Sequence, residues 1–190
     1  MLSEKMLSET MLSEKMLSGK MESIYSQCLV QASKSNLLYR HGCIATYGGK
    51  IICKGCNTTT YSTDEFIKNN CTCHAEINVL RRMFQKYQRQ SKEEKIRKIF
   101  RKTTLYISRL TNSGQSQNSA PCVECLSMIR RFEIKRIIFC NNKIYYSIDP
   151  CKYETEHHSY GKLYIEKMTK MTNLTKKVDL NLNLKLKLNL

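Results

Sequence analysis

Two short motifs constrain the fold of this chain more than any other feature of its sequence. They read CHAE at residues 73–76 and PCVEC at residues 121–125. Together they offer one imidazole from His74, two thiolates from Cys122 and Cys125, and one carboxylate, Glu76, that is not needed as a ligand. Three protein ligands leave the fourth tetrahedral position of a zinc ion open, which is the catalytic rather than the structural arrangement. The fold must therefore bring two distant segments to one metal ion.

Each motif opens a segment whose apolar residues recur at helical spacing. After His74 these residues are Leu80, Met83, Phe84 and Tyr87. Glu76 falls on the same face, so its side chain should point inward. Pro121 suits the first turn of the second helix. The predicted buried face of that helix is Cys122, Cys125, Leu126 and Ile129. Both cysteines should lie near a helix N-terminus, where the helix dipole favours thiolates.

The remaining patterns predict the fold class. A helix is expected over 22–38, and strands over 42–47, 50–56, 104–108, 135–140 and 143–148. The dipeptide Gly48-Gly49 between the first two strands is a strong hairpin signal. This order of elements predicts an α/β protein, a three-layer α/β/α sandwich with a mixed sheet of about five strands.

The two motifs together resemble the H-x-E and P-C-x-x-C signature of the zinc deaminases. Over residues 22–148 the chain resembles the cytidine and deoxycytidylate deaminase family. The resemblance implies a cytidine deaminase-like fold and Zn²⁺ bound by His74, Cys122 and Cys125. It implies Glu76 as the general acid and base. The expected reaction is hydrolytic deamination of a cytosine nucleoside or nucleotide to the uracil form, with release of ammonia.

The resemblance extends to the expected first hairpin. Its segments are HGCIA at 41–45, GGK at 48–50 and GCN at 55–57. In the family, an asparagine closing the second strand hydrogen-bonds a sugar hydroxyl of the substrate, and Asn57 matches that position. By the same resemblance His41 and Ala45 line the base pocket. The alternative for Asn57 is an ordinary turn asparagine.

Two departures from the family pattern bear on the substrate. Residues 111–120 form a longer polar loop beside the expected pocket, and position 120 is Ala where many members carry Ser or Glu. The turn at Asn141-Asn142 is too short for a helix, which implies an antiparallel fifth strand. The deaminases of free cytidine share that feature. It favours a small substrate over a nucleic acid.

The charge supports a rival hypothesis. The net charge is +16, and residues 81–102 contain ten basic residues. Such a stretch could bind phosphate backbones, as an RNA or single-stranded DNA editing enzyme requires. No aromatic residues alternate with the basic ones to form a stacking platform. A third hypothesis is a non-catalytic zinc-binding interaction module, with the loop at 111–120 filling the pocket.

The ends and the cysteines complete the expectations. Residues 1–20 are a low-complexity MLSEK repeat, 21–165 the deaminase domain, and 166–190 a low-complexity Leu/Asn/Lys tail. The ten cysteines, without a secretory signal, indicate a reducing, cytoplasmic setting. No apolar run is long enough for a membrane helix, so no membrane partner is expected. A second zinc at Cys53, Cys56, Cys71 and Cys73 is disfavoured, because the first two should face opposite sides of a strand. The resemblance leaves a homo-oligomer open.

Overall fold

The computed structural model describes residues 18–59, 72–89 and 92–172. Its labelled helices are α2 (Gly19–Ser33), α3 (Ala75–Gln88), α4 (Glu93–Phe100), α5 (Val123–Arg131) and the 3₁₀ helix η1 (Pro150–Lys152). The strands are β1 (Arg40–Tyr47), β2 (Lys50–Cys56), β3 (Thr103–Leu110), β4 (Arg136–Asn141) and β5 (Ile144–Ile148). A further helix spans 160–172. The N-terminal repeat up to residue 17 and the chain from residue 173 lie outside the described residues.

The five strands form one mixed sheet in the order β2-β1-β3-β4-β5. Strand β1 is antiparallel to both β2 and β3, β3 is parallel to β4, and β4 is antiparallel to β5. Positive φ angles at Asn142 (49°) and Lys143 (68°) close the last hairpin in two residues. The predictions of a mixed five-stranded sheet and an antiparallel fifth strand are confirmed.

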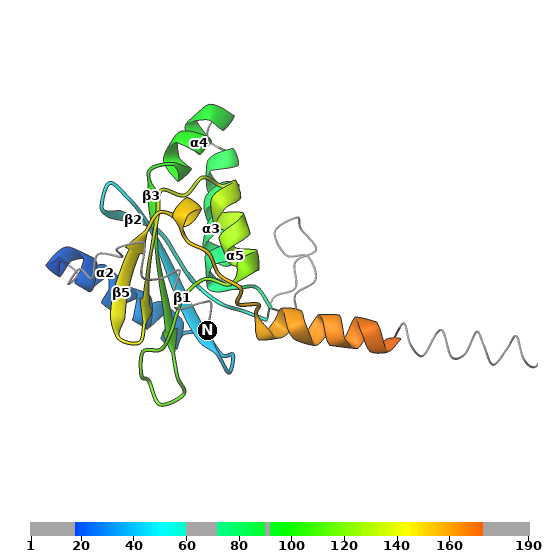
Figure 1. Cartoon of the computed structure of the whole chain (residues 1–190). Helices are drawn as coiled ribbons and strands as arrows, with labels where there is room; N and C mark the ends of the chain where they lie inside the picture. Colours follow the sequence, from blue (N-terminus) through cyan, green and yellow to red (C-terminus); the bar gives the residue numbers. More distant parts are fainter. Residues whose placement is uncertain (1–17, 60–71, 90–91, 173–190) are drawn as a thin grey trace, which may run out of the picture.

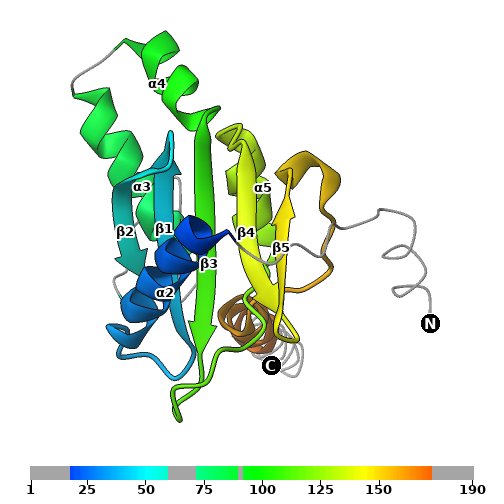
Figure 2. The ribbon, with the colours of Figure 1, turned by 90° about the vertical axis from the view of Figure 1, so that its left-hand side faces the viewer.

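Helices cover both faces of the sheet, which confirms the three-layer α/β/α architecture. Helix α2 packs on one face, where Tyr25 and Cys28 meet Ile44 and Tyr106. Helices α3 and α5 pack on the other face in the larger apolar cluster. Figures 1 and 2 show α2 alone on its side of the sheet, with α3 and α5 on the opposite side.

The approach of α2 to the sheet depends on Gly42. A Cβ atom at this position would lie 2.5 Å from the Ala32 backbone nitrogen and closer still to the Cys28 carbonyl oxygen. Since real Cβ atoms do not approach backbone so closely, only glycine lets α2 pack directly on β1. The helix ends at Ser33, earlier than the predicted residue 38. Ser35 is buried beyond it and donates its hydroxyl to the Asn57 carbonyl oxygen at 3.1 Å.

The strand directions gather several chain ends at one edge of the sheet. In the register, Gly42 lies opposite Cys56, and His41 lies opposite Arg109. The start of β1 therefore lies between the carboxyl ends of β2 and β3. Helices α3 and α5 each follow one of those two strands in the chain and begin at the same edge. The two motifs thus meet at the edge where β1 begins and where β2 and β3 end.

None of the helices within the described ranges is both long and apolar enough to cross a membrane.

Candidate active site

His74, Cys122 and Cys125 come together as a metal-ligand group. Their ligand atoms all lie within 4.8 Å of one another. The His74 Nδ1 atom is 3.2 Å from the Cys125 Sγ and 3.5 Å from the Cys122 Sγ. A tetrahedral zinc with ordinary Zn–N and Zn–S bonds separates such atoms by about 3.6 Å. The three side chains therefore fit a zinc ion with little rearrangement.

Two helix starts hold these ligands. His74 is the N-cap residue of α3, and Cys122 is the N-cap residue of α5. The helix of the second motif thus begins at Val123, so Pro121 precedes the first turn that the sequence predicted it to occupy. Before α3, Thr58 and Cys73 pair through two backbone hydrogen bonds, of 3.0 and 2.9 Å. This bridge fixes His74 beside the residues that follow β2.

The three ligand side chains perturb one another's protonation. A hydrogen bond from the Cys125 thiol and the contact with His74 together lower the pKa of Cys122 to about 6, although burial opposes this. The hydrogen bond with Cys122 and burial raise the pKa of Cys125, and the Glu76 carboxylate adds to that rise. Burial lowers the pKa of His74, but its contact with Cys122 outweighs this and raises it. Metal ligands bind in their deprotonated forms, so binding of a cation here would release protons from the group.

Glu76 lies next to this group without being part of it. It is in the first turn of α3, on the predicted inward face, and is only 4% exposed. Its carboxylate contributes to raising the pKa of the Cys125 thiol, which places its charge close to the metal-ligand group. A buried carboxylate is normally paired with a cation or a proton donor. Here its position is the one that a proton carrier beside an open metal position requires.

The three residues expected to contact substrate lie on one side of this site. Asn57 is buried, and its Oδ1 accepts from the His41 backbone N–H at 2.8 Å. Its Nδ2 donates to the Tyr39 carbonyl oxygen at 2.6 Å. His41 and Ala45 both lie on the strand face covered by α3, with Ala45 fully buried in the core. Burial, with smaller effects of Arg109, His74 and His157, lowers the pKa of His41 to about 3, so its imidazole is neutral at pH 7.

The segment after β5 supports the start of α5, a contact that sequence reasoning missed. The Val123 N–H donates to the His157 carbonyl oxygen at 2.9 Å, at the start of α5. The His158 Nδ1 lies 2.9 Å from the Oε1 of Glu124, a residue that stands between the two cysteine ligands in the sequence. Both histidines are exposed, as expected. They support α5 from a distant part of the chain, which no local spacing could indicate.

The loop at 111–120 is anchored rather than loose. Thr111 N–H donates to the Gln115 carbonyl oxygen, so the loop turns back on itself. Ser119 is fully buried, accepts from the Cys140 N–H at 3.0 Å and donates to the Ile107 carbonyl oxygen at 2.8 Å. Figure 2 shows the loop running past the end of β3 before it returns to α5.

The four cysteines of the alternative second zinc site are described only in part. Within the described residues, no set of three metal-binding side chains other than His74, Cys122 and Cys125 comes as close together. Cys53 packs against the α3 side of the sheet and contacts the Val79 carbonyl oxygen at 3.8 Å. Cys71 lies outside the described residues.

Comparison with known proteins identifies the family. Residues 19–141 match the family model described as the cytidine and deoxycytidylate deaminase zinc-binding region. The chain belongs to this family of zinc-binding deaminases. Its cofactor is accordingly Zn²⁺, and His74, Cys122 and Cys125 form the candidate site for it.

One solved structure shows the same fold, and others are similar to parts of the chain. Cytidine deaminase from Burkholderia pseudomallei is 10% identical over 75% of this chain and 100% of its own, with a TM-score of 0.50. A dCMP deaminase from the cyanophage S-TIM5, in apo form, is 21% identical over 64% of this chain and 82% of its own, with a TM-score of 0.43. The same phage enzyme is known in complex with dCMP and dUMP. No curated protein sequence matches the chain.

Proposed function

We propose that this protein catalyses the hydrolytic deamination of a cytosine nucleoside or nucleotide to its uracil form, with release of ammonia. One observation carries the proposal: a buried carboxylate, Glu76, lies against a group of one histidine and two cysteines that fits zinc with one position open. A structural zinc site would have four protein ligands and no need of this carboxylate.

The residues of the site divide the reaction between them. His74, Cys122 and Cys125 would hold Zn²⁺, which would supply the Lewis acid that activates a water molecule. Glu76 accepts one proton of the attacking water and delivers it to the ring nitrogen. It then takes the second proton from the new hydroxyl on the ring carbon and gives it to the departing amine, which leaves the uracil carbonyl and ammonia. Burial keeps this proton exchange between Glu76 and the substrate.

The proposed substrate contacts use hydrogen-bonding groups of Asn57 and His41. The Asn57 amide already makes two hydrogen bonds to the backbone, which fix its orientation. One Oδ1 lone pair and one Nδ2 hydrogen remain for a sugar hydroxyl. His41, neutral at pH 7, lines the base pocket as a hydrogen-bonding ring rather than as a cation. Ala45, lying further into the sheet, closes its floor.

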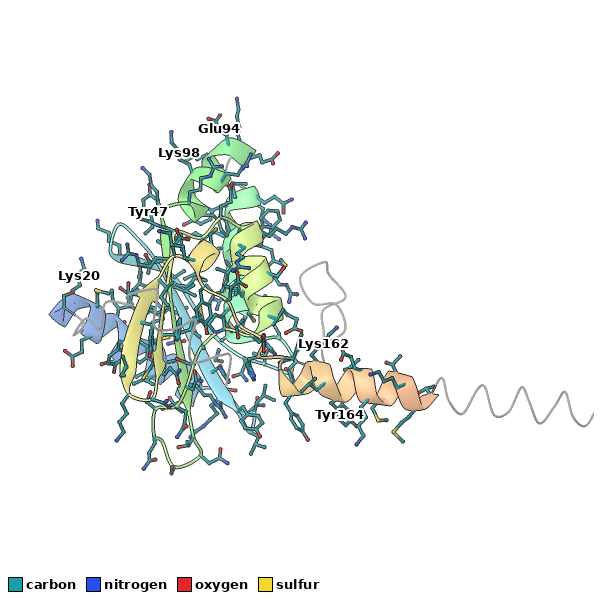
Figure 3. All side chains as sticks on the ribbon, in the orientation of Figure 1. Lys20, Tyr47, Glu94, Lys98, Lys162 and Tyr164 are labelled. Carbon is teal, nitrogen blue, oxygen red and sulfur yellow. The ribbon has the colours of Figure 1, made fainter. Side chains whose placement is uncertain are left out.

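The position of the basic stretch favours this function over nucleic-acid editing. Figure 3 places Lys98, on α4, at the top of the molecule and Lys162, on the helix over 160–172, well below it. The start of α5 binds the His157 carbonyl, so the candidate site lies at the end where the helix over 160–172 begins. Two arginines of the basic stretch, Arg97 and Arg101, pair with Glu133. The antiparallel fifth strand agrees with a small substrate.

The chemistry of the ligands also favours the reducing cytoplasm as the site of action. Cys122 and Cys125 must remain thiolates to hold zinc, and a disulfide between them would abolish the site.

Ammonia release by zinc-loaded protein tests the proposal. The substrates are cytidine, deoxycytidine, their monophosphates, adenosine and a short oligonucleotide, and Glu76→Ala protein is the blank. We expect turnover of at least one small cytosine substrate and none by the variant. If no small substrate released ammonia although one zinc is bound per chain, the proposal would be overturned in favour of a macromolecular substrate or a non-catalytic zinc module.

A further inference from the structure

Arg109 is placed to face the candidate site. It is the last residue but one of β3, at the edge where the two motifs meet. Side chains alternate along a strand, and Leu105 and Ile107 belong to the core beneath α3 and α5. Arg109 therefore lies on the helix-covered face that also holds the metal-ligand group. It is half-buried.

The neighbours of Arg109 connect it to the proposed sugar contact. Its register partner on β1 is His41, whose backbone N–H donates to the Asn57 Oδ1. Its guanidinium lies over the Tyr39 ring, 5.0 Å from the ring centroid. The Tyr39 carbonyl oxygen accepts the other hydrogen bond of Asn57. Arg109 and Asn57 thus share two neighbours and form one continuous rim.

The guanidinium of Arg109 is held by a ring contact, and its N–H donors have no partner among the described residues. Within the described residues it makes the ring contact with Tyr39 and neither a hydrogen bond nor an ion pair. Other arginines differ: Arg101 pairs with Glu133, and Arg130 donates to the Pro150 carbonyl oxygen and pairs with Glu154. A half-buried arginine with five free N–H donors is well suited to bind an anion.

The anion expected beside a bound nucleotide sugar is its phosphate. We infer that Arg109 binds the 5′-phosphate of the substrate, so the preferred substrate is a cytosine nucleoside monophosphate rather than the free nucleoside. Guanidinium and phosphate match as a pair of parallel hydrogen bonds, and the Tyr39 ring leaves the donor edge of the guanidinium free. This inference rests on the proposed function, because it takes the sugar to lie at Asn57.

The test compares each nucleoside with its own monophosphate. Ammonia release is measured for cytidine against CMP and for deoxycytidine against dCMP, with zinc-loaded wild-type and Arg109→Gln protein. Arg136→Gln is the matched control, since it removes the same charge at the start of β4, on the opposite edge of the sheet. We expect Arg109→Gln to lower kcat/KM for the monophosphate about 10- to 100-fold, mainly through KM, the range for a lost charge-assisted hydrogen bond. Nucleoside turnover and the control should change less than about threefold on the scale of a surface substitution.

A binding measurement separates this inference from the proposed reaction. Calorimetry with dUMP and deoxyuridine, which are products and are not consumed, requires no turnover. If wild-type protein is inactive yet binds dUMP more tightly than deoxyuridine, and Arg109→Gln removes the difference, the proposed reaction fails and the inference stands. Equal losses on nucleoside and monophosphate, or no loss on either, would overturn the inference while leaving the reaction intact. A larger loss of kcat/KM for a cytosine trinucleotide than for dCMP would also overturn the inference. Arg109 would then bind a phosphodiester of a nucleic-acid strand instead of a 5′-monophosphate.

Discussion

Replacement of Asn57 by alanine should destabilise the fold as well as weaken substrate binding. The side chain joins the residue after β2 to the start of β1, accepting from the His41 N–H at 2.8 Å and donating to the Tyr39 carbonyl oxygen at 2.6 Å. Asn57 is only 6% exposed, so water does not readily replace its amide. The same residue that is proposed to hold the sugar therefore also fixes the edge of the sheet.

The size of the effect follows from the two partners left behind. A buried donor or acceptor that loses its partner costs about 1–3 kcal/mol. Tyr39 is 45% exposed, so water can reach its carbonyl and the cost there should be at the lower end. The sum is about 2–3 kcal/mol of unfolding free energy. For a domain of this size that corresponds to a fall in Tm of about 4–12 °C.

Urea and thermal unfolding followed by circular dichroism measure this loss, with Asn36→Ala as the control. Asn36 is an exposed asparagine before β1. Its replacement should change the unfolding free energy by less than about 0.5 kcal/mol. Asn57→Asp sharpens the test: it keeps the acceptor for His41 but turns an oxygen toward the Tyr39 carbonyl, so it should be no more stable than Asn57→Ala. Unchanged stability of Asn57→Ala, with only a higher KM, would refute the structural half of this reasoning.

Three further predictions concern pH, packing and metal. Because burial lowers the pKa of His41 to about 3, the unfolded chain binds a proton below about pH 6.5 that the folded protein does not bind. The unfolding free energy should therefore fall on acidification, by about 2 kcal/mol at pH 5. His41→Asn should remove this pH dependence in urea titrations. Gly42→Ala should cost about 1–3 kcal/mol or more, because its Cβ meets the α2 backbone, whereas Gly19→Ala, with open space around it, should be neutral by the same assay. Cys125→Ser should bind less than one zinc per chain by atomic absorption, and full zinc content would contradict the assigned ligand set.

Local patterns explain what could be predicted. Helical spacing after His74 placed Glu76 on the inward face, and its side chain is buried there. The same spacing after Cys122 placed Cys125 and Ile129 in the core, where both lie. Alternating and apolar runs marked the strands. The short turn predicted at 141–142, which lies at 142–143 in the structure, indicated the direction of β5. These features depend on residues within one or two turns of each other.

Contacts across the sheet could not be predicted in the same way. Arg109 and His41 become neighbours only through the pairing of β1 with β3, and no local spacing sets that register. The support of Glu124 by His158 joins residues 34 positions apart in an otherwise polar segment. The early end of α2 depends on Ser35, whose hydroxyl bonds the Asn57 carbonyl from another element. In each case the determining partner is tertiary.

We propose separate roles for zinc and Glu76 in one site, and a single measurement on Glu76→Gln protein tests these roles. Zinc content and ammonia release are determined together on the same preparation as the wild type. We expect one zinc per chain in both proteins and a loss of about 10²- to 10⁴-fold in kcat in the variant, the usual contribution of a general acid and base. Turnover near the wild-type rate with zinc in place would contradict these roles, and so would loss of the metal, because Glu76 is not one of the three proposed ligands.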